Sequence, residues 1–489
     1  GAGNTAIGYQ ANLYNATGNN NTYLGYNAGL GVSTNSHSDN VGIGRNALLA
    51  VTTGSSNVAI GSNAGDALAA ANSCVAVGTN ALGAVATQDG TVAIGTNALM
   101  VLTSGGGNTA VGYQAGAGLI GGANNVIWGY GAADLVSTAS NNVVIGKDAW
   151  GDVPADVAIE GCVVIGTSAM SGGGGTTAGA NYTIAIGQSA QQAITSGAKN
   201  IGIGYATLRH NRTGTDNIAI GYGALYDQDV GGSENARNCD HNIAIGSLAM
   251  SGAFADSLSE RNVAIGSLSL NGALDTATDN TSIGYGSSSS LNSGSSNVVV
   301  GALAGTVITT GDNNTCIGYN AEVSTGGAGG QIAIGKDVAC VGDSTITVGL
   351  AGNTASLGLD GSDTSWAAAS SDERLKENIE SSSAGLGFIN DLRPVTYNWK
   401  KAKDVQKELP QYKDSNEPVL GTEYGETLHG FIAQEVKSAI DKHDNIKEGF
   451  KMWKLKDDGT QTVADGNLIP MLVKAVQELS AEVEKLKNK

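Results

Sequence analysis

The 489-residue sequence contains few aromatic, charged and proline residues. Aromatic side chains make up 5% of the chain and charged side chains 14%, and there are 5 prolines, whereas glycine occurs 73 times. Ordinary globular cores depend on large apolar and aromatic side chains. The composition therefore favours a repetitive or fibrous protein.

Basic residues are especially scarce in residues 1–370. This part holds 8 of the 26 Lys and Arg residues and 23 of the 44 Asp and Glu residues, which makes its net charge about −15. A surface with so few cations cannot neutralise a phosphate backbone, so nucleic acid is excluded as its partner. Residues 371–489 are nearly balanced, at about −3.

Long apolar runs and clustered cysteines are also missing. Gly, Asn or Ser interrupts the apolar stretches every few positions, so none approaches the roughly 20 residues of a membrane-spanning helix. The five cysteines form no C-x-x-C pair and have no histidines at ligand spacing, so we expect no metal site, no cofactor and buried thiols. They are Cys74, Cys162, Cys239, Cys316 and Cys340.

One short pattern recurs through the N-terminal part of the chain. It consists of Asn, an apolar residue, a small residue, an apolar residue, Gly, two variable residues and usually Ala, and it occurs about twenty times. The commonest spacing between its glycines is 17 residues, which is typical of stacked structural repeats. Representative copies are NTAIGYQA at Asn4, NVAIGSNA at Asn57, NTAVGYQA at Asn108, NIAIGYGA at Asn217 and NTCIGYNA at Asn314.

Each copy predicts a short β-strand with a corner at each end. The alternation of Val58, Ala59 and Ile60 places the two large aliphatic side chains on one face of the strand. Gly61 permits a tight corner, and the Asn before the strand suits a turn. At an inter-strand spacing of about 4.8 Å, about twenty coils would form a rod on the order of 95 Å long. We expect ladders of Ile and Val to fill its interior.

These repeats resemble the head domains of trimeric autotransporter adhesins, which are left-handed parallel β-rolls with the same N-x-(V/A)-A-I-G core. The resemblance covers about residues 1–350 and implies a mainly β fold with a trimeric β-solenoid shaft. Pieces such as Gly42-Ile43-Gly44 are weak dinucleotide fingerprints, because no helical pattern follows the glycines. We interpret them as structural parts of the repeat.

Several coils carry longer turns, which would project from the shaft. The most polar of them lies between Tyr222 and Asn242 and contains Tyr226, Arg237 and His241. Loops on a rigid scaffold often carry binding residues, so these three side chains are candidates for contact with a saccharide or protein receptor. The alternative is a solvated loop without a ligand.

The composition changes after the repeat ends. A polar, Ala-rich segment separates the last repeats from a charged and mixed sequence. We therefore predict a solenoid shaft in residues 1–350, a linker in residues 351–370 and a small α+β domain in residues 371–489.

Three segments of this C-terminal domain have distinct patterns. Residues 386–399 predict a short helix and a strand that meet at Pro394, and residues 429–437 predict a strand that enters a helix. Residues 468–487 predict a long helix, which is either one strand of a trimeric coiled coil or a simple core helix. Its apolar seam consists of Leu472, Ala475, Leu479, Val483 and Leu486.

Four motifs occur in order along the domain. They are S-S-D-E-R-L-K-E-N-I from Ser370, L-R-P-V-T-Y-N-W from Leu392, G-F-I-A-Q-E-V from Gly430 and L-I-P-M-L-V-K-A-V-Q-E-L from Leu468. Together they resemble the peptidase S74 family, the intramolecular chaperones of phage endosialidases, tail fibres and neck appendages. They are also similar to the self-cleaving region of myelin regulatory factor. The resemblance implies a chaperone that drives trimerisation and then cuts itself off.

The same resemblance implies a nucleophile and a base at the start of the domain. Ser371 would be the nucleophile and Lys376 its base, with the cut between Ser371 and Asp372. Lys376 accepts a proton near neutral pH only if its pKa falls from about 10.4, which burial or the positive charge of Arg374 would cause. Because the nucleophile lies in the substrate strand, each chain reacts once.

Two further polar residues are candidate helpers of the cleavage. Asn378 belongs to the motif that contains Ser371, and His429 precedes the G-F-I-A-Q-E-V motif. For His429 the alternative is a hydrogen-bonding residue at the end of a strand. No external substrate is implied by this chemistry.

These features predict the distal part of a phage-like fibre or spike that attaches to a host cell, as part of a virion. Expected partners are two further copies of the chain, a host-surface receptor and tail components bound through a region before Gly1, because the sequence starts inside a repeat. The alternatives are a trimeric adhesin on a bacterial surface and a polysaccharide-degrading tailspike. The latter would need carboxylate pairs about 5–9.5 Å apart in a cleft.

Overall fold

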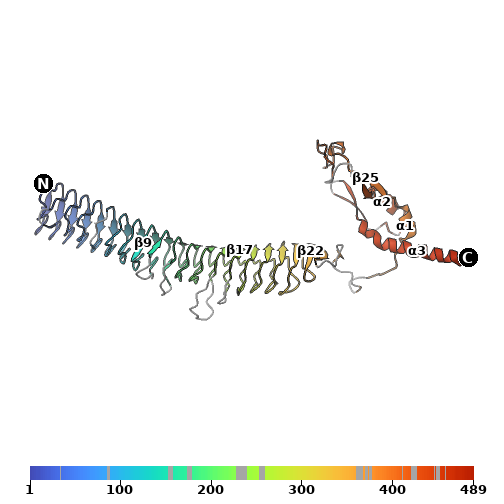
Figure 1. Cartoon of the computed structure of the whole chain (residues 1–489), viewed down its shortest axis with the longest axis horizontal. Helices are drawn as coiled ribbons and strands as arrows, with labels where there is room; N and C mark the ends of the chain where they lie inside the picture. Colours follow the sequence, from blue (N-terminus) through green and yellow to red (C-terminus); the bar gives the residue numbers. More distant parts are fainter. Residues whose placement is uncertain are drawn as a thin grey trace. The chain divides into compact units, whose positions relative to one another are not determined.

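In the computed structural model the chain forms two compact units, Gly1–Ser370 and Ser371–Lys489. The first unit is a long β-solenoid, which confirms the predicted mainly β fold class (Figure 1). The structure describes residues 1–488 apart from several short segments. These segments are 33–34, 85–88, 152–157, 173–178, 227–238, 253–258, 360–366, 369–372, 374–376, 410, 420–426, 445, 448–451 and 457–458.

The solenoid is built on one 22-stranded sheet. Its coils stack in parallel and in register, as in the pairing of Val58 with Val75 and of Ile60 with Val77. A separate two-stranded sheet consists of β9 (Thr138–Ser140) and β11 (Ala158–Glu160). The parallel strands of the large sheet are β1 (Thr5–Ile7), β2 (Thr22–Leu24), β3 (Val41–Ile43), β4 (Val58–Ile60), β5 (Val75–Val77), β6 (Val92–Ile94), β7 (Thr109–Val111), β8 (Val126–Trp128), β10 (Val143–Ile145), β12 (Val163–Ile165), β13 (Ile184–Ile186), β14 (Ile201–Ile203), β15 (Ile218–Ile220), β16 (Ile243–Ile245), β17 (Val263–Ile265), β18 (Thr281–Ile283), β19 (Val298–Val300), β20 (Thr315–Ile317), β21 (Ile332–Lys336) and β22 (Thr345–Leu350).

The sheet continues into the segment that we expected to be a linker. β22 pairs in antiparallel fashion with β23 (Asn353–Gly358), and β23 pairs with β24 (Ala367–Ala368). Residues 351–370 therefore contain two strands. A hairpin at this point covers the last strand edge of the stack, which would otherwise present unpaired backbone groups.

In most coils the small middle residue of the strand lines the interior, and the Ile and Val at the first and third positions face outward. The expected interior ladders of Ile and Val were therefore wrong. Ala59 is fully buried, whereas Ile60 is 39% exposed and Val58 is partly exposed. The opposite wall of the coil contributes the larger interior side chains, such as Leu48 and Leu68. The space between the two walls accepts an alanine and a leucine, and the branched strand residues point outward.

A column of glycines lets neighbouring coils approach closely at the end of each strand. Gly61 has a φ of 136°, and a Cβ atom at this position would lie 2.5 Å from the carbonyl oxygen of Gly78 in the next coil. Both the backbone conformation and the contact exclude a side chain. The repeat therefore requires glycine here.

A ladder of buried asparagines precedes the strands. Oδ1 of Asn280 accepts hydrogen bonds from the backbone N–H and from Nδ2 of Asn297, each at 3.0 Å. Nδ2 of Asn297 also donates to the carbonyl oxygen of Gly311 at 2.9 Å. Each amide thus joins two coils and braces the interior of its own coil, with its polar atoms satisfied. Cys74 and Cys162, which are buried as expected, take ladder positions through their backbone N–H groups.

In one coil the strand contributes the large interior side chain and the opposite wall contributes the small residue. In β2 the middle residue is Tyr23, which is fully buried, and the opposite wall has Gly29. The next coil has Gly42 at its middle position, where an added Cβ atom would lie 2.6 Å from the Tyr23 ring. The Tyr23 hydroxyl lies 3.1 Å from Nδ1 of His37, which is also fully buried. Large and small residues therefore compensate each other between neighbouring coils.

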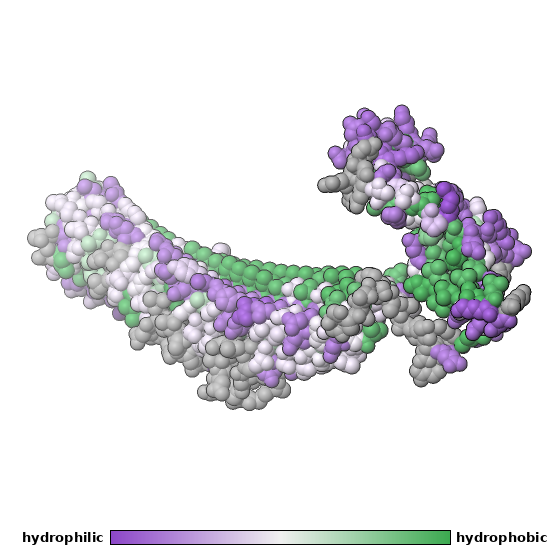
Figure 2. Space-filling model, turned by 45° about the vertical axis from the view of Figure 1, so that its right-hand side comes forward, coloured by the Kyte–Doolittle hydropathy of each residue, from purple (hydrophilic) through white to green (hydrophobic). Residues whose placement is uncertain are grey.

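The outward strand residues form a continuous apolar face, which we call the outer stripe. It consists of the first and third residue of each strand of the large sheet from β1 to β20, and these positions hold only Val, Ile, Leu, Thr and Trp. Figure 2 shows it as a green band along the solenoid. A surface this large and apolar is typical of an interaction site. Its exposed members include Ile7, Leu24, Ile60, Ile94, Val126, Trp128, Ile203, Ile220, Ile283, Val298 and Ile317.

The second unit is a small α+β domain whose elements agree with the three predicted patterns. Its helices are α1 (Leu386–Asp391), α2 (Ala433–Asp441) and α3 (Ile469–Lys487), with 3-10 turns η2 (Ala402–Asp404) and η3 (Asp465–Leu468). Its hairpins pair β25 (Val395–Tyr397) with β26 (Leu428–Gly430) and β27 (Trp453–Leu455) with β28 (Gln461–Val463). Phe388, Val436, Ile440, Met452 and Leu468 form its core. None of the described helices is long and apolar enough to cross a bilayer.

Replacing Gly42 by Ala should destabilise the solenoid by about 1–3 kcal/mol, because the new methyl group would overlap the Tyr23 ring in a filled interior. Thermal unfolding followed by circular dichroism measures the loss. Combined with Tyr23→Ala, the substitution should cost much less than it does alone, because its neighbour is then gone. Strict additivity of the two effects would contradict the packing described here.

The stability of the N-terminal coils should fall at acid pH. Burial lowers the pKa of His37 to about 4 from 6.5, so between these values the unfolded chain binds a proton that the folded coil does not. The stability is therefore complete above pH 6.5 and declines by up to about 3 kcal/mol as the pH falls to 4. Urea midpoints at pH 7.5 and 4.5 measure this change. The His37→Gln chain should lose less stability over this interval, and an unchanged loss would refute the assignment.

Candidate functional site

The predicted cleavage site lies at the start of the second unit. Ser371, Asp372, Arg374 and Lys376 lie outside the described residues, so their geometry and the environment of Lys376 stay predictions. Asn378, the predicted helper in the same motif, is described. It is solvent-exposed and has a φ of 51°, a conformation that asparagine tolerates better than most residues.

The other predicted helper, His429, lies on a hairpin. It is the central residue of β26, opposite Thr396 of β25, and it is solvent-exposed. The hairpin joins the L-R-P-V and G-F-I-A-Q-E-V motifs, which are far apart in the sequence. Both the structural alternative and a role beside Ser371 therefore stay predictions for His429.

The same two motifs are also joined by an ion pair. Nε of Arg393 donates to Oε2 of Glu435 at 2.9 Å, and Nη2 donates to Oε1, so the guanidinium holds both carboxylate oxygens. The hydrogen bonds from Arg393 lower the pKa of Glu435 below its usual range. Bidentate pairs of this kind fix orientation as well as proximity. Arg393 and Glu435 thus set the start of α2 against the segment between α1 and β25.

A second polar contact, which the sequence did not indicate, joins the end of α1 to the residues that directly follow α2. Nε2 of His443 lies 2.9 Å from Oδ2 of Asp391, and Nζ of Lys442 lies 3.6 Å from its Oδ1. The hydrogen bond with His443 is the main reason that the pKa of Asp391 is lowered. The His443 ring also stands edge-on to buried Phe388. No local motif indicates this pair, because 52 residues separate its members.

Helix α3 exposes an apolar seam that differs from the predicted one at a single position. Ala475 is buried, and it lies on the part of α3 that contacts α1. Glu478 on this part of α3 accepts a hydrogen bond from the backbone N–H of Leu386 at 2.8 Å. The exposed seam uses Val476 instead, because the face with Ala475 is covered by the domain itself. Its residues are Leu472, Val476, Leu479, Val483 and Leu486, with exposures of 41–70%.

The predicted receptor residues take different partners in the solenoid. The Tyr226 hydroxyl accepts a hydrogen bond from Nη1 of Arg209 at 3.0 Å, and the guanidinium lies 5.7 Å from the ring centre. Nε2 of His241 lies 3.9 Å from a carboxylate oxygen of Asp216. Arg237 lies outside the described residues. Tyr226 therefore stacks on the coil before it, and receptor contact stays a prediction for all three.

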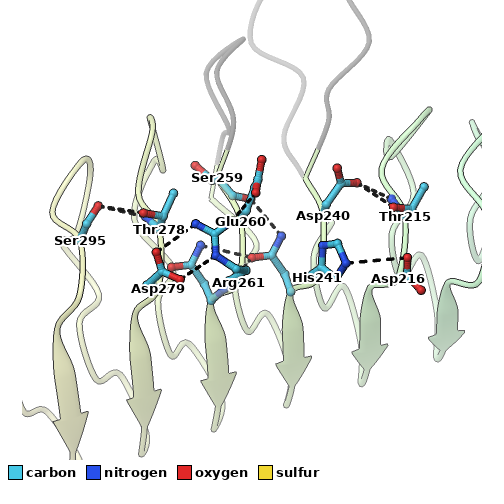
Figure 3. Close-up of polar contacts among 12 residues, drawn as sticks. Thr215, Asp216, Asp240, His241, Ser259, Glu260, Arg261, Thr278, Asp279 and Ser295 are labelled. Carbon is cyan, nitrogen blue, oxygen red and sulfur yellow. Dashed lines mark hydrogen bonds and ion pairs between the residues drawn. The ribbon is translucent and has the colours of Figure 1, made fainter.

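His241 belongs to a row of polar residues at the N-terminal ends of the strands, which we call the polar edge (Figure 3). The row consists of the residue that directly precedes each ladder position, and it includes Asp216, Arg261 and Asp279. Nε of Arg261 donates to Asp279 at 2.7 Å and Nη1 donates to Glu260 at 2.5 Å. In the part of the chain that the structure describes, no group of three or more His, Cys, Asp or Glu side chains is arranged to hold a metal ion.

Comparison with known proteins identifies the family of a domain in the second unit. Residues 371–445 match the family Peptidase_S74, described as "Chaperone of endosialidase". The chain has no significant match among curated proteins or among solved structures. The matched residues begin at Ser371 and end after α2, so they include the first three of the four motifs. The second unit therefore carries a Peptidase S74 chaperone-of-endosialidase domain in residues 371–445, and its combination with a β-solenoid shaft fits a phage tail fibre or tailspike with a C-terminal chaperone.

Proposed function

We propose that the chain is the distal part of a homotrimeric tail fibre that mediates host attachment, and that its C-terminal chaperone drives trimerisation and then cleaves itself off. The observation that carries the proposal is the Peptidase S74 domain behind a solenoid with an uncovered apolar face. A tail-fibre chaperone of this kind suggests a protein that is extracellular or associated with a virion.

The outer stripe supports assembly with further copies of the chain. It carries no charge over its two columns from β1 to β20 and repeats at the coil spacing of about 4.8 Å. A partner that covers it along its whole length needs the same length and repeat, and another copy of the chain has both. The exposed seam of α3 offers a second surface for the same assembly. Three copies is the number that the adhesin-like repeats imply.

A chaperone is needed because the coils are so alike. Neighbouring copies have many alternative axial registers with similar apolar contacts, and a wrongly paired stack exposes strand edges and apolar surface. An aligner at one end lets the stack form in a single register. Removal of the aligner afterwards leaves the assembled shaft kinetically trapped, because the route by which it formed is gone.

The proposed cleavage chemistry uses Ser371 and Lys376. Lys376 takes the proton of the Ser371 hydroxyl, and the activated oxygen attacks the carbonyl of the bond to be cut. This carbonyl belongs to Ser371 itself, so the attack closes a four-membered lactone. Lys376 returns its proton to the amide nitrogen of Asp372, which leaves as a free amine, and water then opens the lactone to give the Ser371 carboxylate and its hydroxyl. The base must be neutral at working pH, which requires a lowered Lys376 pKa.

Purified wild-type chain should separate into two fragments after residue 371, while Ser371→Ala and Lys376→Ala chains stay intact. Intact-mass spectrometry distinguishes these outcomes. Ser370→Ala is the matched control, because it removes the neighbouring hydroxyl and should leave cleavage unchanged. Normal fragmentation of the Lys376→Ala chain would rule out the proposed base.

A charge placed on the outer stripe should prevent assembly. Ile60→Asp would bury a carboxylate in each copy of an apolar interface, which costs several kcal/mol per ion. Light scattering coupled to size exclusion should give a trimer mass for the wild type and a lower mass for the variant. Ala70→Asp changes an exposed turn of the same coil and should remain trimeric. Monomeric wild-type chain would refute the proposed assembly.

A further inference from the structure

We propose that, in this trimer, the C-terminal edge of the outer stripe on one copy packs against the polar edge of the next copy at the same coil, so that Arg45 meets the neighbour's Asp39. The inference rests on the proposed function and specifies its interface. Its occupant is a second copy of this chain.

The strands are parallel and in register, so each edge of the stripe collects equivalent residues from every coil. The edge at the C-terminal ends holds the residue that follows each repeat glycine, and we call it the tyrosine edge. Between β1 and β20 its residues include no acidic side chain. They are Tyr9, Tyr26, Arg45, Ser62, Thr79, Thr96, Tyr113, Tyr130, Lys147, Thr167, Gln188, Tyr205, Tyr222, Ser247, Ser267, Tyr285, Ala302 and Tyr319.

The tyrosines of this edge are exposed, and six of them stack in pairs. The rings of Tyr205 and Tyr222 lie 5.1 Å apart with an interplanar angle of 12°, and Tyr113 stacks on Tyr130 in the same way. The exposures of the edge tyrosines lie between 43% and 63%. Tyrosine is enriched where one surface binds another, because a rigid ring offers apolar area together with a hydroxyl donor. The edge is therefore a ready contact surface along the stripe.

The polar edge on the opposite side supplies acceptors. Asp39, Asp216 and Asp279 stand on it, and the last two keep 38% and 46% of their side-chain surface exposed. Figure 3 shows Asp216, His241, Arg261 and Asp279 in a row above the N-terminal ends of the strands. The stripe is thus flanked by donors on one side and by a row that contains carboxylates on the other.

Threefold symmetry brings these two different edges together. When three copies turn their stripes toward a common axis, the left edge of one copy faces the right edge of the next, which makes the contact heterologous. If the copies are not shifted along the axis, each coil faces the same coil of its neighbour. Residues on the two edges of one coil then become partners between chains.

At four coils the side chains at equal levels are chemically matched. At β3 the tyrosine edge has Arg45 and the polar edge has Asp39, both exposed. Within one chain these two residues lie at opposite ends of the strand, roughly 15–20 Å apart. At β15 the equivalent pair is Tyr222 and Asp216, a hydroxyl donor and a carboxylate.

Two further coils continue the match. At β18 Tyr285 lies level with Asp279, and at β14 Tyr205 lies level with Lys199, an aromatic ring with a cation. A shift of one coil would place Arg45 opposite neutral Asn20 or Ser56 instead of Asp39. The edges therefore favour one axial register, which the uniform outer stripe does not specify.

Disulfide trapping tests the contact in the full-length chain. With Asp39→Cys and Arg45→Cys in the same chain, mild oxidation should produce covalent dimers and trimers on a denaturing gel. Either single variant should produce none, because equivalent residues do not meet across a heterologous interface. The five native cysteines are buried, which keeps the background low. The displaced control, Asp39→Cys with Thr79→Cys, separates the thiols by about 10 Å along the axis and should not cross-link.

The oligomeric mass, measured in parallel, separates the two proposals. Monomeric wild-type chain would overturn the trimer, and this contact with it. Wild-type trimers whose double variant fails to cross-link, or whose single variants cross-link equally well, would overturn the edge contact alone. A charge exchange gives a second measurement: Arg45→Asp should lower the trimer's melting temperature, and adding Asp39→Arg should restore it. Absence of any restoration would also overturn the contact.

Discussion

The narrow interior of the solenoid coil is the constraint on which the other features depend. An alanine from the strand and a leucine from the opposite wall fill the space, as Ala59 and Leu68 do in one coil. The branched residues on either side of the alanine have no room inside, so they form an outer stripe that water does not solvate well. The interior of each coil is thus fully packed, while a long apolar surface stays exposed on the outside and is available to a partner.

The same coil geometry makes the stack regular, so one coil is hard to distinguish from the next. The glycine column and the asparagine ladder impose one coil spacing, and both repeat almost unchanged along the shaft. Exceptions such as Tyr23 above Gly42 distinguish one coil from the next within a chain. The outer stripe itself repeats the same few residue types from coil to coil, so it carries few such distinctions.

The C-terminal domain is stabilised in a different way from the solenoid. It has no repeat, and its small core of residues around Phe388 is supplemented by ion pairs that join segments distant in sequence. Arg393 and Glu435 hold two of the family motifs together, and part of α3 is bound to α1 while another face stays exposed. The domain is therefore folded within one chain and still presents a surface suited to assembly.

The repeat, the β-solenoid, the C-terminal domain and its helices were all predictable from the sequence, because glycine spacing, strand alternation and helical periodicity are local properties. The peptidase family was also evident from ordered motifs. Alternation alone does not say which face of a strand is inside, so only the packed coil showed that Ala59 is buried and Ile60 faces outward. For the same reason the pairing of His443 with Asp391 and the burial of Ala475 depended on contacts between distant segments, which the chain makes only when it is folded. The continuation of the sheet past residue 350 is a local hairpin, but it falls outside the repeat pattern from which the strands were predicted.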